Sequence, residues 1–170
     1  MSSRTVYAGR VFSVRRDRVI EPGGVEATRD VVVHPGSVVV MPVFPGGRIL
    51  MIRQYRHSVG RFLWELVAGR IDRGESPLTA ARRELAEETG YTARRYRKLM
   101  DLFPTPGFVT ERMVVFAAEG LREGQARPEE DERITSRIVK LHEAEKWIRT
   151  GKIRDAKSVA AILYYLRFHR

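Results

Sequence analysis

The segment GRIDRGESPLTAARRELAEETGY, near the middle of the chain, constrains the fold more than any other part of the sequence. Ser76 is a favourable N-cap residue, and Pro77 suits the first helical position because its missing N–H would have no partner there. Residues 78–89 are helix formers without a breaker, and Gly90 can adopt the left-handed conformation that ends a helix. The sequence therefore predicts a helix over about residues 76–89.

The same segment concentrates carboxylates in a chain whose formal net charge is +10. On the predicted helix, Glu84 and Glu88 lie one turn apart and Glu87 lies close to both. Three carboxylates on one face repel each other unless something neutralises them, and Arg83 can pair with Glu87 at i,i+4 spacing. An oxygen-only ligand set suits a hard cation, Mg²⁺ or Mn²⁺. The alternative is a solvated helix face held by Glu–Arg salt bridges.

The spacing of this segment resembles the Nudix box, G-x5-E-x7-R-E-U-x-E-E-x-G-U, in which U is an apolar residue. Every defined position is filled, with the aromatic Tyr91 as a variant at the last one. The resemblance implies structural roles for four box residues, Gly69, Glu75, Arg83 and Gly90. This resemblance to the Nudix hydrolases implies hydrolysis of a nucleoside diphosphate linked to another group.

The Nudix resemblance also implies a metal site that holds two to three Mg²⁺ or Mn²⁺ ions. The family's metal ligands fall on the carbonyl of Ala68 and on the side chains of Glu84, Glu87 and Glu88. For Glu75 we expect a structural role, in which it pairs with Arg83 and orients the helix.

The composition fits one globular domain, because 170 residues with 43% hydrophobic content can bury a core. The chain has no apolar run long enough to span a membrane and no apolar stretch typical of a signal peptide. It has no cysteine, which is compatible with the cytoplasm. The positive charge favours an anionic partner. Its scattered basic residues suit a small phosphorylated substrate, and we expect neither a nucleic-acid nor a membrane partner.

Apolar and β-branched segments between Gly and Pro turns predict strands on both sides of the helix. They lie at 5–15, 18–20, 27–33, 37–44, 48–55, 62–67, 96–102, 112–118 and 138–141, and two helices follow at 142–150 and 155–168. This order indicates an α/β protein with a mixed sheet. The Nudix resemblance implies an α/β/α sandwich with an additional N-terminal antiparallel sheet region. We expect a single Nudix domain over 1–170, with about 1–35 contributing to dimerisation and about 36–170 forming the core.

Segments outside the box resemble the bacterial ADP-ribose pyrophosphatase subfamily. Pro106 and Gly107 lie in FPTPGFVTE, similar to a loop that accompanies ADP-ribose preference. Arg56 ends QYR, similar to a motif whose arginine reaches the substrate phosphates. Arg29 lies in RDVVVHPG, similar to a strand that helps form the adenine pocket across a homodimer interface. GKIRDAKS, at 151–158, resembles the segment that opens the family's last helix. Taken alone, either arginine is more often solvated than bound to a ligand.

The general base is expected in an acidic loop after the box, since metal-bound carboxylates have their lone pairs engaged. In similar enzymes this loop supplies the base, and here it reads PEEDERI at 128–134. Alignment on Ile134 places Glu130 at the catalytic position and Glu132 second. The alternative is a solvated acidic turn.

Two other functions remain open from the sequence. A Nudix hydrolase of this kind can act on a different nucleoside diphosphate sugar, such as GDP-mannose. A non-catalytic module that binds ADP-ribose or RNA is the second alternative, against which the intact glutamates of the box argue. Metal-dependent release of AMP or GMP distinguishes these hypotheses.

Overall fold

A mixed sheet of seven strands forms the centre of the protein in the computed structural model, which describes residues 1–127 and 133–169. Five strands follow the order β10-β5-β4-β9-β8, while β6 pairs with β5 and β7 pairs with β4. Strands β4 and β9 are parallel, and the other pairs are antiparallel. The strands are β4 (Ser37–Phe44), β5 (Arg48–Arg56), β6 (Arg61–Glu65), β7 (Val67–Arg70), β8 (Thr92–Leu102), β9 (Met113–Arg122) and β10 (Ile134–Lys140).

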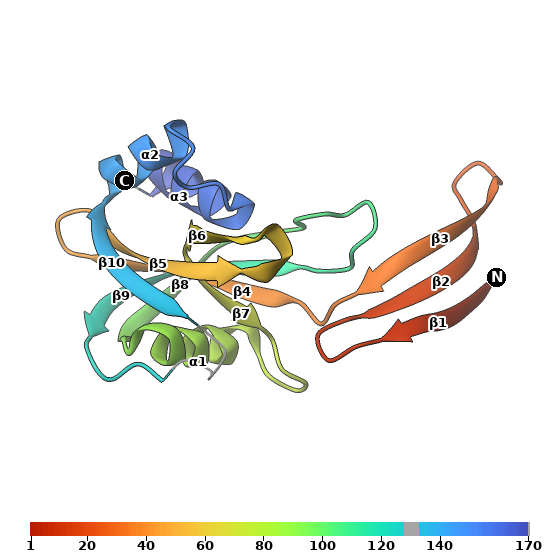
Figure 1. The fold of residues 1–170 in the computed structure, drawn as a ribbon, viewed down its shortest axis with the longest axis horizontal. Helices are drawn as coiled ribbons and strands as arrows, with labels where there is room; N and C mark the ends of the chain where they lie inside the picture. Colours follow the sequence, from red (N-terminus) through yellow and green to blue (C-terminus); the bar gives the residue numbers. More distant parts are fainter. Residues whose placement is uncertain (128–132, 170) are drawn as a thin grey trace.

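Helices cover both faces of this sheet (Figure 1). Helix α1 (Pro77–Thr89) lies on one face, and α2 (Leu141–Arg149) with α3 (Ala156–Phe168) lies on the other. The central strand β4 serves both layers because successive side chains point to opposite faces. Val38 and Val40 pack in the α1 layer, whereas Val39 and Met41 pack in the layer of α2 and α3. The predicted α/β/α sandwich with a mixed sheet is confirmed.

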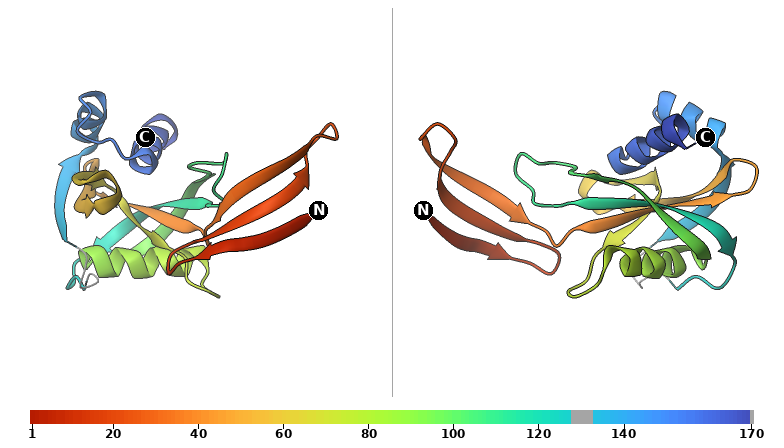
Figure 2. Two further views of the ribbon diagram at one scale, coloured as in Figure 1. Left: turned by 45° about the vertical axis from the view of Figure 1, so that its right-hand side comes forward. Right: turned by 180° about the vertical axis from the view of Figure 1, so that it is seen from behind.

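The first three strands form a separate antiparallel sheet that extends away from the core (Figures 1 and 2). They are β1 (Ser2–Ala8), β2 (Ser13–Ile20) and β3 (Glu26–Val33), in the order β1-β2-β3. The additional N-terminal antiparallel sheet is therefore confirmed. The prediction of one strand over 5–15 is wrong, because the chain reverses at a turn closed by a 2.9 Å hydrogen bond from Gly9 N–H to the Phe12 carbonyl. The apolar residues of that turn continue a strand-like pattern and so conceal it.

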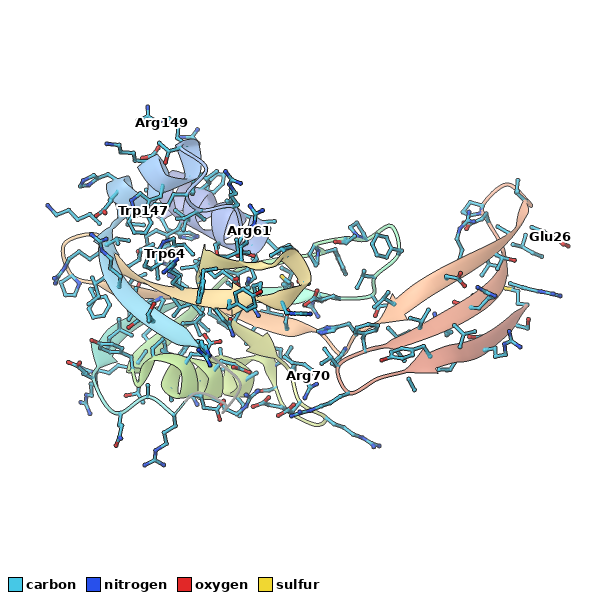
Figure 3. All side chains as sticks on the ribbon, viewed as in Figure 1. Glu26, Arg61, Trp64, Arg70, Trp147 and Arg149 are labelled. Atoms are coloured by element: carbon cyan, nitrogen blue, oxygen red, sulfur yellow. The ribbon has the colours of Figure 1, made fainter. Side chains whose placement is uncertain are left out.

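Both the N-terminal sheet and the layer of α2 and α3 contact the central sheet and its loops. Strand β3 bonds the loop after β8, through Val32 N–H to the Phe108 carbonyl at 2.8 Å and Thr110 N–H to the Val32 carbonyl at 2.9 Å. In the layer formed by α2 and α3, the Trp64 ring of β6 packs on the Trp147 ring of α2 with centroids 5.1 Å apart (Figure 3). Within the described residues, no helix has the length and apolar character needed to cross a membrane.

Candidate active site

Helix α1 has the ends that its sequence predicts. The Ser76 side chain accepts a 3.1 Å hydrogen bond from Thr79 N–H, and Pro77 occupies the first turn. Gly90 has φ 76° and donates its N–H to the Ala86 carbonyl at 2.9 Å. A side chain at 90 would also collide with the backbone of Gly124 and Ala126, so this glycine allows a close approach as well as a left-handed conformation.

The start of the box lies directly against the helix. A Cβ built on Gly69 would overlap the carboxyl group of Glu84, so only glycine lets that carboxylate approach strand β7. Ala68 precedes Gly69 on the same strand. The structure therefore brings the predicted carbonyl ligand and one predicted carboxylate ligand to neighbouring positions.

Arg83 ties the loop before α1 to the helix. Its Nε and Nη2 donate to the two carboxylate oxygens of Glu75 at 3.1 and 3.0 Å, and Nη2 also donates to the Arg70 carbonyl at 2.9 Å. Glu75 accepts a third bond from Asp72 N–H at 3.1 Å. Hydrogen bonds from Arg83 hold the pKa of Glu75 below its usual value. The structure thus contains the ion pair expected between these two box residues.

The other arm of Arg83 bonds two of the predicted metal ligands. Nη1 donates to Glu84 Oε1 at 2.7 Å and to Glu87 Oε2 at 3.1 Å. Hydrogen bonding to Glu75, followed by the charge of Glu84, raises the pKa of Arg83 above its usual value. No three acidic or histidine side chains in the described part of the chain converge as a metal cluster in this conformation. Nevertheless, the donors fit a hard cation, since carboxylate oxygens meet a backbone strand where the glycine leaves room.

Glu88 is the most buried of the three helix carboxylates, at 4% relative exposure. Its negative charge contributes to raising the pKa of Arg56, for which the largest cause is hydrogen bonding to Glu65. Arg56 Nε and Nη2 donate to the two oxygens of Glu65 at 2.9 and 2.7 Å. The structure therefore places a fixed guanidinium near the acidic face of α1.

A cavity of about 360 Å³ opens between these groups. It is lined by Arg10, Val11, Arg56, Ala68, Gly69, Arg70, Asp72, Arg83, Glu84 and Glu87. Arginines and carboxylates thus face the same space, an arrangement that suits phosphates bound together with a cation.

Arg10 and Val11 also line the cavity, which the sequence did not predict. They form the turn between β1 and β2, and the Arg10 carbonyl accepts a 3.3 Å hydrogen bond from Arg70 Nη1. Figure 3 shows Arg70 beside this turn. Gly9, isolated in a strand-like pattern, was the only signal for a turn there.

Three of the residues expected to bind substrate lie elsewhere in this chain. Arg29 is on β3 and pairs with Glu21 at 3.0 Å. Pro106 and Gly107 belong to the loop that bonds β3. Among the described residues that line the cavity, none of the three appears.

Glu130 and Glu132, the candidates for the base, lie outside the described residues. The chain on either side of them is described. Arg127 N–H donates to the Glu87 carbonyl at 2.8 Å, and Ile134 pairs with Gln54 across β10 and β5. Both flanks therefore lie beside elements that carry cavity residues, since Glu87 is on α1 and Arg56 is on β5.

The fold and the box define a Nudix hydrolase. A model of the NUDIX domain matches residues 33–162, and a model of the nucleoside diphosphate sugar hydrolase N-terminal domain matches residues 1–32. The chain belongs to the Nudix family, which confirms the resemblance inferred from the box.

Named relatives cover nearly the whole chain. An ADP-ribose pyrophosphatase of Mycobacterium tuberculosis is 42% identical over 167 residues, which cover 96% of this chain and 80% of that protein. An ADP-ribose pyrophosphatase of Bacillus subtilis is 36% identical over 166 residues, covering 96% and 90%. A solved structure described as an ADP compounds hydrolase matches with a TM-score of 0.87 at 23% identity, covering 99% of this chain and 91% of its own. At that identity, the structural match supports the fold.

Proposed function

We propose that this Nudix hydrolase cleaves the diphosphate of ADP-ribose to give AMP and ribose 5-phosphate. The observation that carries the proposal is the cavity in which Arg56 faces the box carboxylates, in a chain of which two relatives, 42% and 36% identical over 96% of its length, are named ADP-ribose pyrophosphatases. A diphosphate needs positive charge around it, and the cavity offers arginines on one side and a cation-binding acidic face on the other.

The metal would be Mg²⁺ or Mn²⁺, with two to three ions held by Glu84, Glu87, Glu88 and the carbonyl of Ala68. Such ions neutralise phosphate charge and polarise the bond that is cleaved. Arg83 supplies counter-charge for Glu84 and Glu87. Its third carboxylate partner, Glu75, keeps it anchored to the loop. Arg83 therefore limits the repulsion between the metal ligands and keeps α1 in register with β7.

Glu130 would accept the proton of the attacking water, with Glu132 as the second candidate. The bond from Arg127 to the end of α1 supports this proposal, because it attaches the start of the acidic loop to the helix that carries the box. A base must come within hydrogen-bond reach of the water, and box carboxylates engaged with metal are poor proton acceptors.

The active form would be a homodimer in which Arg29, Pro106 and Gly107 contribute to a partner's substrate pocket. Two observations support this. The three residues do not line the cavity of their own chain, and the N-terminal sheet and its turns expose apolar side chains, including Tyr7, Ile20 and Val25. If sedimentation gives only monomer at micromolar concentration, or if Arg29→Ala leaves KM for ADP-ribose unchanged, the dimeric pocket is wrong.

A substrate panel with Mg²⁺ tests the proposed reaction. ADP-ribose, GDP-mannose and other nucleoside diphosphate sugars would be compared by release of AMP or GMP. We expect the highest kcat/KM for ADP-ribose. A much higher kcat/KM for GDP-mannose would overturn the substrate, and the absence of any turnover would favour a non-catalytic binding module.

A further inference from the structure

The first turn of α3 is joined to the cavity wall by a buried ionic network. Glu65, at the end of β6, is only 1% exposed, and its two carboxylate oxygens accept the bidentate bonds from Arg56. Lys157 Nζ donates to Glu65 Oε2 at 2.5 Å and to Asp155 Oδ1 at 2.9 Å. The Lys157 side chain is itself only 10% exposed. The order of contacts is Asp155, Lys157, Glu65 and then Arg56, of which Arg56 lines the cavity.

The same turn also holds the backbone beside this network. Asp155 caps α3 by accepting from Ser158 N–H at 3.0 Å, and it accepts a second bond from the Ser158 hydroxyl at 2.5 Å. That hydroxyl oxygen accepts the N–H of Leu66 at 2.7 Å. Leu66 lies between β6 and β7, two residues before Ala68. In Figure 1, α3 lies beside β6 on the face of the sheet opposite α1.

Lys157 and Arg56 share one buried carboxylate, that of Glu65. A buried carboxylate is strongly disfavoured unless it is paired, so Glu65 takes the geometry that satisfies both of its cations. Burial alone would raise the pKa of Glu65, but the bonds and charges of Arg56 and Lys157 hold it below the usual value. A bidentate bond also fixes the plane of the guanidinium, and Arg56 has further N–H donors besides the two that bond Glu65.

We infer that Lys157 is a positioning residue that presets Arg56 toward the cavity by fixing the carboxylate of Glu65. The inference rests on the proposed function, in which Arg56 binds a substrate phosphate. It gives the RDAKS part of the 151–158 segment a role in substrate binding, although its residues lie about 90 positions after Glu65 and outside the cavity lining. Lys157 fixes the orientation of the Glu65 carboxylate to which Arg56 donates, and Asp155 in turn accepts a hydrogen bond from Lys157.

The test compares Lys157→Met with Lys152→Met as a matched control. Lys152 lies over the Trp147 ring, on the same side of the sheet but outside the network. We expect Lys157→Met to raise KM for ADP-ribose about tenfold, the scale of a lost hydrogen bond between charged groups, with a smaller change in kcat. Lys152→Met should keep the wild-type KM, and Lys157→Arg should recover most of the loss. Calorimetric titration of ADP-ribose in EDTA should show the same rise in Kd without metal or turnover.

A double-mutant cycle with Arg56→Ala separates positioning from general stability. If Lys157 acts through Arg56, then Lys157→Met should change KM by less than about twofold in the Arg56→Ala background. An equal effect of Lys157→Met in both backgrounds would overturn the inference, and so would a lowered Tm with unchanged KM and Kd. Asp155→Asn keeps the helix cap and serves as a second variant. Asp155→Asn should raise KM for ADP-ribose, but by less than Lys157→Met does. If Lys157→Met does not fold and Asp155→Asn leaves KM unchanged, the inference is wrong.

The wild-type measurements distinguish this inference from the proposed substrate. Preference for GDP-mannose would overturn ADP-ribose as substrate. The double-mutant cycle of Lys157→Met and Arg56→Ala would then be measured with GDP-mannose: loss of the Lys157→Met effect in the Arg56→Ala background would support the inference, and an equal effect in both backgrounds would overturn it. Failure of the wild-type chain to bind or cleave either compound would contradict both the function and the role of Lys157.

Discussion

The carboxyl group of Glu84 occupies the space that a Cβ at residue 69 would need. The first glycine of the box is therefore required by a tertiary contact between β7 and α1, since neither a tight turn nor a positive φ is involved at this position. This contact brings a carboxylate to the backbone of Ala68 and Gly69, where the proposed metal site lies. The local shape of the site thus depends on the absence of one side chain.

Replacing Gly69 by alanine should damage the site more than the fold. The added Cβ must displace Glu84, which would break its bond to Arg83 and move a metal ligand. We expect metal affinity to fall about 10–100-fold, as for other changes that misorient ligands. Isothermal titration with Mn²⁺ and activity at rising Mg²⁺ measure this. Gly46→Asn is the control, because residue 46 has φ 77° and open space around it, and asparagine tolerates that conformation. Equal metal affinity in Gly69→Ala and wild type would contradict the packing argument.

The ionic network at Glu65 should make stability sensitive to acid. The folded-state pKa of Glu65 is lowered, so its ionic contribution is fully present above the unfolded-state pKa of about 4.3 and is lost as pH falls through the folded-state value. Urea unfolding between pH 7 and pH 3 should therefore show the free energy of unfolding falling below about pH 4.

Glu65→Gln provides the matched test of that dependence. At pH 7 it should lose about 3–5 kcal/mol, because Lys157 and Arg56 are left without their buried anion. Its remaining loss on acidification should be smaller than that of the wild type. Glu145→Gln, on the exposed side of α2, should behave like the wild type. Parallel acid profiles for Glu65→Gln and wild type would show that Glu65 does not govern the transition.

The acidic loop should contain one carboxylate whose removal affects kcat alone. Glu130→Gln should reduce kcat by about 10²–10⁴, the usual range for a general base, with KM and metal affinity nearly unchanged. Steady-state kinetics at saturating Mg²⁺ on Glu129→Gln, Glu130→Gln and Glu132→Gln give the comparison, with Glu129→Gln as control. If only Glu132→Gln lowers kcat in this way, the base is Glu132. If neither Glu130→Gln nor Glu132→Gln lowers kcat, the base lies elsewhere.

Local chemistry made α1 predictable, whereas contacts between distant residues did not follow from the sequence. Ser76, Pro77 and Gly90 determine the helix ends through neighbouring residues, so their pattern was sufficient. The ion pair of Arg83 with Glu87 followed from their i,i+4 spacing, whereas the pairing of Arg83 with Glu75 was an expectation of the Nudix resemblance. By contrast, Arg10 reaches the cavity through the packing of a turn on Arg70, 60 positions away.

The failures have the same physical origin. The strand expected over 5–15 is wrong because the turn at Gly9 contains apolar residues, which carry no polar turn signal. The contact of Lys157 with Glu65 joins residues that are 92 positions apart, so no local pattern could reveal it. The resemblance identified residues 151–158 as the segment that opens the last helix. The structure shows why this segment starts a helix, because Asp155 caps α3 by accepting the Ser158 N–H.

The central claim is that the box glutamates, with a divalent cation, cleave the diphosphate of ADP-ribose. The most direct measurement is ³¹P NMR of ADP-ribose incubated with Mg²⁺ and wild type, Glu84→Gln or Glu88→Gln, with folding checked by circular dichroism. Wild type should convert the diphosphate signals to those of AMP and ribose 5-phosphate. Each variant removes a ligand charge at nearly constant size and should lose about 10³-fold or more in kcat while staying folded. Near-normal conversion by both variants at saturating Mg²⁺, or no conversion by wild type, would contradict the account.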